Sequence, residues 1–166
     1  MQLRDQSKSL SLDDFKLMLK QHDFFDYDWN KKGHGCVNQF EIYSANDINL
    51  IKDNSSNLLW QQDGSHVKLN FEQAQKYIED LNNNIYANFK DWRLPTLKEA
   101  LSLLKPKKSK DDLFIDPIFD EKQWGIWTSD LVSGKSRAWT VSFSLGSCQG
   151  YIFANLNFVR AVRSMG

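Results

Sequence analysis

Apolar residues recur at helical spacing in three stretches of the chain, and each stretch follows a residue that can cap a helix. Ser11 precedes the first stretch, whose apolar positions are Phe15, Met18 and Leu19. Asn70 precedes the second, whose apolar positions are Phe71, Ala74, Tyr77, Ile78 and Leu81. Thr96 precedes the third, whose apolar positions are Leu97, Ala100, Leu101 and Leu104. Steps of three and four residues place such side chains on one face, so the pattern predicts short amphipathic helices.

The stretch from Asp91 to Leu101 is the most completely specified part of the chain. Pro95 fixes its own φ and favours an extended conformation at the residue before it, so no helix can run through this point. Thr96 and Glu99 have the spacing of a capping box, in which each side chain bonds the other residue's backbone N–H. We therefore predict an extended segment, an abrupt turn and a short helix.

Short apolar runs and alternating positions predict strands in two parts of the chain. The early ones are 37–43 and 46–52, which pair as a hairpin, and 58–60. The late ones are 127–129, 138–144, 151–154 and 158–163, with turns at 145–147 and 155–157. This order predicts an α+β fold in which two to three short helices pack on a twisted antiparallel sheet. We expect residues 1–56 to form a helix and aromatic-rich extension that packs on a domain of residues 57–166.

Composition narrows the class of protein. Hydrophobic residues make up 41% of the chain and charged residues 25%, as in globular domains. Lys and Arg balance Asp and Glu at 21 each, so nothing indicates a nucleic-acid or anionic-membrane partner. No apolar run approaches the ~20 residues that span a bilayer. Residues 1–11 lack the apolar core of a signal peptide, which favours the cytoplasm unless a leader has been removed.

Several segments, in order, resemble one family. They are LLWQQDGS (58–65), FEQA (71–74), DWRLPT (91–96), WTS (127–129) and FVRAVR (158–163). Together the segments resemble the bacterial family named for the C-terminal domain of a collagen-like adhesin (Lcl C-terminal domains). The resemblance implies a C-type-lectin-like fold, related to formylglycine-generating enzymes and to phage and bacterial variable receptor proteins. It brings no catalytic residues to this chain.

In C-type-lectin-like receptors the late β region usually forms the ligand-binding face. Here this region combines aromatic, amide and charged residues that suit a sugar, a peptide or a protein epitope. The candidate ligand-binding residues are Trp127, Ser129, Asp130, Arg137, Trp139, Gln149, Tyr151, Asn155 and Asn157. The alternation of Trp139 with Val141 and Phe143 also fits a position in the core.

A second set of residues is expected to be structural. It comprises Trp60, Trp92, Arg93, Pro95, Thr96, Glu99, Arg160 and Arg163. We expect the two tryptophans in the core. A buried guanidinium needs an acceptor, so Arg93 and at least one of the two late arginines should pair with carboxylates such as Asp91 or Glu99.

Asp26, Asp28 and Asn30 have the alternate spacing of oxygen ligands in a calcium loop. An EF-hand also needs Gly at its sixth position and a carboxylate at its twelfth, where this chain has Lys31 and Val37. The other interpretation is an aromatic-rich turn whose carboxylates cap local backbone groups. The calcium-dependent sugar motifs of lectins are absent as well, so we expect no metal and no cofactor.

Cys36 and Cys148 are either reduced thiols or a single disulfide. Residues 37–147 separate them, whereas the thiol pair of formylglycine-generating enzymes is close in sequence.

Together these observations predict a non-catalytic recognition module that binds a protein or glycan without calcium. We expect it neither to bind nucleic acid nor to insert into a membrane. One alternative is a sensor or regulatory domain of a larger signalling protein, for example a kinase, with contacts on residues Phe24 to Trp29. An enzyme of the formylglycine-generating type is the third.

Overall fold

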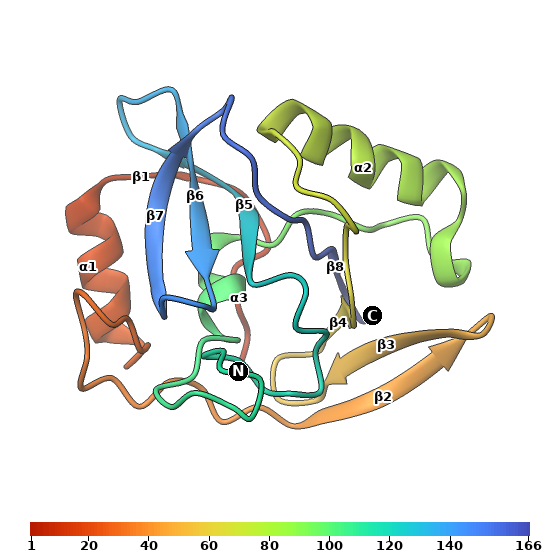
Figure 1. The fold of residues 1–166 in the computed structure, drawn as a ribbon, viewed down its shortest axis with the longest axis horizontal. Coiled ribbons are helices and arrows are strands. Elements are labelled where there is room, and N and C mark those ends of the chain that lie inside the picture. Colours follow the sequence, from red (N-terminus) through yellow and green to blue (C-terminus); the bar gives the residue numbers. More distant parts are fainter.

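The computed structural model describes residues 1–166 and contains two four-stranded sheets (Figure 1). The first sheet has the order β1-β5-β6-β7, formed by Ser9–Leu10, Gly125–Val132, Arg137–Ser142 and Ser147–Ile152. The second has the order β2-β3-β4-β8, formed by Phe40–Ala45, Ile48–Asp53, Leu58–Gln61 and Val162–Ser164. All neighbouring strands are antiparallel except β1 and β5, which are parallel.

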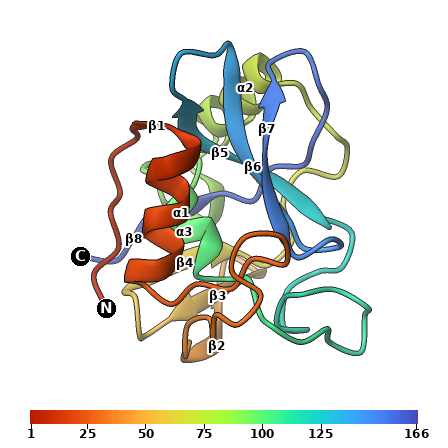
Figure 2. The same cartoon turned by 90° about the vertical axis from the view of Figure 1, so that its left-hand side faces the viewer.

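Three α-helices begin at the predicted caps. They are α1 (Leu12–Gln21), α2 (Phe71–Asn83) and α3 (Leu97–Leu101), and a short 3-10 helix, η1 (Tyr86–Asn88), follows α2. Ser11, Asn70 and Thr96 each form a complete capping box with the residue three positions later. Helices α1 and α2 lie at opposite sides of the molecule, and α3 lies at its centre (Figures 1 and 2). The α+β prediction is confirmed.

The core joins the early and late parts of the chain. Its largest cluster includes Leu3, Leu10 and Phe15 together with residues of β6 such as Val141. The ring of Phe15 packs on that of Trp139, with centroids 4.9 Å apart. Two smaller clusters surround Trp92 and Trp127. The N-terminal segment is therefore part of the same packed body as the later sheet residues.

Three predictions about the strands are wrong. The chain forms two sheets, one of them mixed, because β1 joins β5 in parallel while β2 to β4 pair with β8. The strand expected at 151–154 begins earlier, since Ser147 and Cys148 pair with Ser142 and Val141 in β6. The strand expected at 158–163 is mostly an extended segment. Its backbone bonds the loop around Ser65, and only β8 at its end belongs to a ladder.

Candidate functional site

Four of the nine predicted ligand-binding residues are buried: Trp127, Asp130, Trp139 and Asn157. The indole N–H of Trp127 donates to the carbonyl of Leu69 at 2.7 Å, and that of Trp139 donates to the carbonyl of Leu10 at 3.1 Å. The side-chain oxygen of Asn157 accepts from the next backbone N–H. These side chains are structural, and the prediction that they face a ligand is corrected for each of them, because their polar atoms are used inside the fold.

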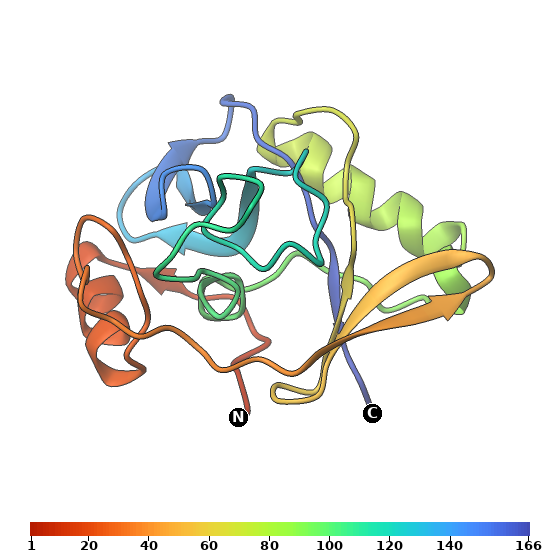
Figure 3. The same ribbon diagram turned by 60° about the horizontal axis from the view of Figure 1, so that its bottom comes forward.

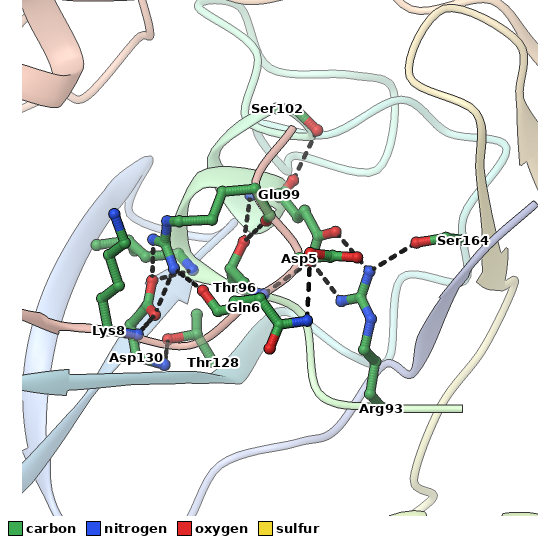
Figure 4. A network of polar contacts seen from close by, with 12 residues as sticks. Asp5, Gln6, Lys8, Arg93, Thr96, Glu99, Ser102, Thr128, Asp130 and Ser164 are labelled. Atoms are coloured by element: carbon green, nitrogen blue, oxygen red, sulfur yellow. Dashed lines mark hydrogen bonds and ion pairs between the residues drawn. The ribbon is translucent and has the colours of Figure 1, made fainter. Parts of the chain in front are cut away.

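Asp130 is the anchor of a buried polar network (Figure 4). Both guanidinium Nη atoms of Arg4 donate to its carboxylate, at 2.9 and 2.6 Å. The backbone N–H groups of Lys8 and Leu97 donate to the same carboxylate at 2.7 and 2.9 Å. The Thr96 hydroxyl also donates to the carbonyl of Arg4 at 2.7 Å. Asp130 therefore links residues 1–10, which we call the N-terminal arm, to the start of α3.

The other five candidates remain at the surface: Ser129, Arg137, Gln149, Tyr151 and Asn155. Most of them lie on β6, on β7 or in the loop after β7. The half-buried ring of Tyr151 packs edge-on against Trp127, with centroids 5.9 Å apart. This strip therefore keeps polar side chains and one tyrosine, but the tryptophans that were expected as binding platforms point into the core.

Two of the three arginines expected to be structural pair with the carboxylates that the sequence indicated. Both Nη atoms of Arg93 donate to the buried carboxylate of Glu99, each at 2.7 Å (Figure 4). Arg163 forms the corresponding pair with Asp91 at 2.7 and 3.0 Å. Trp60 and Trp92 are buried, and so is Thr96 of the capping box beside Pro95.

Arg160 is also buried, but no carboxylate pairs with it. Its Nε donates to the carbonyl of Asp63 at 2.9 Å, and its Nη2 donates to the carbonyls of Gln62 and Asp120. The guanidinium lies over the ring of Phe119, 4.9 Å from its centre. Burial lowers the pKa of Arg160 to about 10, so it stays charged at neutral pH and holds three loop carbonyls together.

Sequence reasoning missed a groove that is lined by residues from the tip of the β2–β3 hairpin, from α2 and from η1. Its first hollow, about 350 Å³, is lined by residues that include Asn46, Ile48, Tyr77, Asp80, Ile85 and Tyr86. A second hollow, about 440 Å³, shares Ile48 and Tyr86 and adds Asp47, Asn49, Gln62, Asp63 and Asp120. We call the two hollows together the tyrosine groove.

Both tyrosines of this groove are held as neutral phenols. Burial raises the pKa of Tyr77 to about 12, and the negative charge of Asp63 adds to the effect. The pKa of Tyr86 is raised by the same two causes. The Gln61 amide donates to the Tyr77 hydroxyl at 2.9 Å and accepts from the N–H of Ala161, which fixes its orientation. The groove therefore presents ordered hydroxyl groups beside a carboxylate.

The charge of the tyrosine groove is negative. Its lining contains four aspartates and no lysine or arginine. Asp80 forms an ion pair with Lys76 on the exposed side of α2, and a carboxylate oxygen of Asp63 lies 3.9 Å from Nε2 of His66. Asp47 and Asp120 form no ion pair. The charge of the buried Arg160 lies near Asp63 and Asp120, but a cationic group in the groove would still meet carboxylates without an ion-pair partner at Asp47 and Asp120.

The two loops that border the groove have unusual backbone conformations. Asn46 and Asp47 have φ of 48° and 59°, as expected for a two-residue hairpin turn. Ile85 and Ala87 have φ of 51° and 52°, and such left-handed conformations are rare for a β-branched residue. They cost about 1–3 kcal/mol each, which the surrounding packing must offset. The Asn46 amide donates to Asn88 at 2.6 Å and ties the loops together. The groove is therefore pre-formed.

The extension at residues 24–30 forms a turn. The Asp26 carboxylate is buried and accepts from the backbone N–H groups of Asp28, Trp29 and Cys148 at 2.9–3.0 Å. Burial raises its pKa, although these three hydrogen bonds oppose the change. The interpretation of this motif as a turn in which a carboxylate caps backbone groups is confirmed for Asp26. No group of three or more His, Cys, Asp or Glu side chains is arranged to hold a metal ion.

The thiols are separate in the structure. Burial raises the pKa of Cys148 well above its usual value, and it also raises the pKa of Cys36. The Nδ1 of His34 lies 2.7 Å from the carboxylate of Asp23, and both side chains are exposed. His34 therefore has an acidic partner but makes no hydrogen bond to either thiol.

The helices are all too short, or too polar, to cross a membrane. Comparison with curated proteins gave no match. The sequence model of the Lcl C-terminal domain matches residues 49–163, from β3 to β8, and so includes α2, α3 and most strands of both sheets. It also includes the groove residues Asp63, Tyr77 and Tyr86. Because this range covers most of the chain, the protein belongs to the Lcl C-terminal domain family.

Proposed function

We propose that this protein is a non-catalytic recognition module that binds a protein or glycan ligand without calcium, and that the ligand occupies the tyrosine groove. The fold that we propose for it is the C-type-lectin-like one that the family implies. The observation that carries the proposal is the pre-formed groove itself, in which two neutral tyrosines lie beside unpaired carboxylates and amides.

The size and chemistry of the groove support binding. Ligand pockets in proteins have volumes of about 300–1,000 Å³, and both hollows fall in this range. Tyrosine supplies a large contact area with few rotatable bonds, so a fixed tyrosine loses little conformational entropy when a ligand binds. Tyr77 is fixed by Gln61, and Tyr86 packs edge-on against Trp92, with centroids 5.7 Å apart.

The charge of the groove favours one kind of ligand. Carboxylates attract ammonium and guanidinium groups, and the face of a tyrosine ring also attracts cations. Asp47, Asp63 and Asp120 would repel a sulfated or carboxylated glycan. A protein segment that presents a Lys or Arg side chain is therefore the ligand that the groove fits best.

The state of the cysteines supports binding in preference to thiol catalysis. A thiolate is the nucleophilic form of cysteine, and a raised pKa disfavours it. Both Cys36 and Cys148 have raised pKa values, and Cys148 is buried. Lys105 lies near Cys36 and acts to lower its pKa, but burial outweighs this effect, and the charged neighbour of Cys148 is the carboxylate of Asp26.

The test is a binding screen of the purified protein against peptide and glycan arrays, with and without chelator. We expect hits among basic peptides that are unaffected by chelator and weakened about tenfold or more by Asp63→Asn, since a charge-assisted hydrogen bond contributes about 1.5–3 kcal/mol. Asp28→Asn makes the same charge change at an exposed site outside the groove and should leave binding intact.

Three results would contradict the proposal. Loss of binding with chelator would indicate a metal-dependent site. Loss in Gln149→Ala with binding retained in Asp63→Asn would move the ligand to the strip on the first sheet. No binding on either array would exclude peptides and glycans, the two ligand classes on which the proposal depends.

A further inference from the structure

The four edges of the two sheets differ in how they are protected. A sheet edge exposes unpaired backbone N–H and C=O groups, and proteins normally cover it, shorten it or interrupt it. β1 has only two residues. β8 is covered by Arg93, whose N–H and C=O both bond Val162 at 3.0 Å. These two edges are therefore closed to another strand.

The edge at β7 is also occupied. The N–H of Cys148 donates to the carboxylate of Asp26 at 3.0 Å. The guanidinium of Arg137 donates to the carbonyl of Gly150, and the N–H of Asn155 donates to the carbonyl of Ile152. Bonds from within the chain thus use one backbone group at each of Cys148, Gly150 and Ile152, so β7 is partly blocked to another strand.

β2 lacks this protection. It pairs with β3 in an unbroken register from Phe40 opposite Asp53 to Ala45 opposite Ile48, with no bulge. It contains no proline, glycine or lysine, the residues that commonly interrupt edge strands. The β2–β3 hairpin projects from the rest of the molecule, and β2 is its outer strand (Figures 1 and 3).

The free groups of β2 can be assigned from the register. In a two-residue hairpin the pair next to the turn is hydrogen-bonded, and bonded and non-bonded pairs then alternate. Ala45, Tyr43 and Glu41 therefore bond β3, while Phe40, Ile42 and Ser44 direct their N–H and C=O groups outward. No other backbone or side chain bonds these outward groups.

The side chains of β2 also favour contact. Ile42 is 56% exposed and Tyr43 is 42% exposed. Glu41 is the only charged residue of the strand, and Lys52 on β3 neutralises it at 3.0 Å. The chain as a whole has no net charge. No electrostatic repulsion therefore opposes the approach of a second β2 strand.

We propose that two copies of this chain associate through β2, antiparallel and about a two-fold axis. Outward-directed residues must face one another for the bonds to form, so Ile42 lies opposite Ile42 of the second copy and Phe40 opposite Ser44. Glu41 then lies opposite Tyr43, and no like charges meet. This register gives about six backbone hydrogen bonds and joins the two β2-β3-β4-β8 sheets edge to edge.

A second copy is the occupant because the strand is complementary to itself. A two-fold interface requires one patch to match its own copy, and the register above meets this condition for backbone bonds, apolar contacts and charge. A single strand pair buries less than the 1,200–2,000 Å² of stable complexes, so the dimer should depend on concentration. This inference does not rest on the proposed ligand groove.

The test is sedimentation equilibrium of the full chain over a range of concentrations up to several hundred micromolar. We expect the mass of the wild type to rise from monomer toward dimer. Ile42→Lys places two cations face to face on the axis and should remain monomeric. Val37→Lys is the matched control, because Val37 is 89% exposed and precedes the strand. It should behave as the wild type.

Hydrogen exchange of the same samples locates the interface. Dimer formation should slow exchange at the amides of Ile42 and Ser44, while that of Tyr43, already bonded to β3, should change little. A wild type that remains monomeric, or a dimer that persists in Ile42→Lys, would overturn the proposal. So would protection that appears only outside β2. Circular dichroism of Ile42→Lys checks that the variant is folded.

Discussion

Replacement of Asp130 by Asn tests whether this residue is structural or contacts a ligand. Each oxygen of the carboxylate accepts two hydrogen bonds. One accepts from Arg4 Nη1 and the N–H of Lys8, and the other accepts from Arg4 Nη2 and the N–H of Leu97. In Asp130→Asn the amide NH₂ must face one of these donor pairs whichever way it is oriented. Two hydrogen bonds are then lost, and Arg4 loses its counter-ion.

The expected destabilisation follows from these contacts. A buried donor left without an acceptor costs about 1–3 kcal/mol, so two of them cost about 2–6 kcal/mol. Loss of one partner of a buried ion pair typically costs about 3–5 kcal/mol. These figures describe the same contacts and are not added. The side chain of Arg4 is 16% exposed, so water can partly replace the lost acceptor. We therefore expect a loss of about 3–4 kcal/mol in the free energy of unfolding.

The assay is urea unfolding followed by tryptophan fluorescence. With a slope of about 1–3 kcal/mol per molar urea, the midpoint of Asp130→Asn should fall by about 2 M. Asp5→Asn removes an exposed carboxylate from the same N-terminal arm and should change stability by less than about 0.5 kcal/mol. A midpoint for Asp130→Asn within about 0.3 M of the wild type, together with lost ligand binding, would refute the structural role. It would support the sequence-based prediction that Asp130 contacts a ligand.

Three further predictions follow from the perturbed groups. Tyr77 should be the last tyrosine to ionise in an ultraviolet titration, near pH 12, and Tyr77→Phe should remove that step. Because folding favours the neutral phenol, the contribution of Tyr77 to stability is complete below pH ~10 and is lost as the pH rises toward 12. Ionisation of Tyr77 near pH ~10 in the folded protein would contradict its raised pKa. Burial would raise the pKa of Asp53, but hydrogen bonds from Asn38, Ser55 and Ser56 outweigh it and lower the pKa. The contribution of Asp53 to stability is therefore present above pH ~4 and is lost as the pH falls through its folded-state pKa. Asp53→Asn should destabilise the protein more at pH ~7 than at pH ~2 in urea titrations. An equal effect at the two pH values would contradict the lowered pKa. Cys148 should resist alkylation in the native protein and react in urea, as mass spectrometry can measure; rapid native labelling would reopen the enzymatic interpretation.

The candidate sites were only partly predictable from the sequence. The polar strip on β6 and β7 stays a prediction, whereas Trp127 on β5 and Trp139 on β6 are buried, a position that the alternation of Trp139 with Val141 and Phe143 also allowed. The tyrosine groove was missed because Tyr77 fits the apolar face of α2 and Tyr86 falls in a segment without periodicity. A signal did exist at Asn46-Asp47, because such residues favour a tight hairpin turn. It would have placed the turn two residues later than the predicted strands 37–43 and 46–52 did.

Local features of the fold were determined by the sequence itself. The three capping boxes at Ser11, Asn70 and Thr96 involve residues only three positions apart, so no distant contact is needed to specify them. The pairing of Arg93 with a carboxylate such as Glu99 was predicted because a buried guanidinium needs an acceptor, and the two residues lie only six positions apart. The family membership also follows from short local segments.

Only the tertiary structure decided which face of each late strand is buried. The carbonyls that bind the indoles of Trp127 and Trp139 lie 58 and 129 residues away in the chain. Strand alternation defines two faces but does not say which one packs, because that depends on the elements that cover the sheet. Here α1 and the N-terminal arm cover the face that carries Trp139, and residues Leu69 and Phe71 cover Trp127. Contacts between distant segments, which no local pattern encodes, thus placed Trp127 and Trp139 in the core.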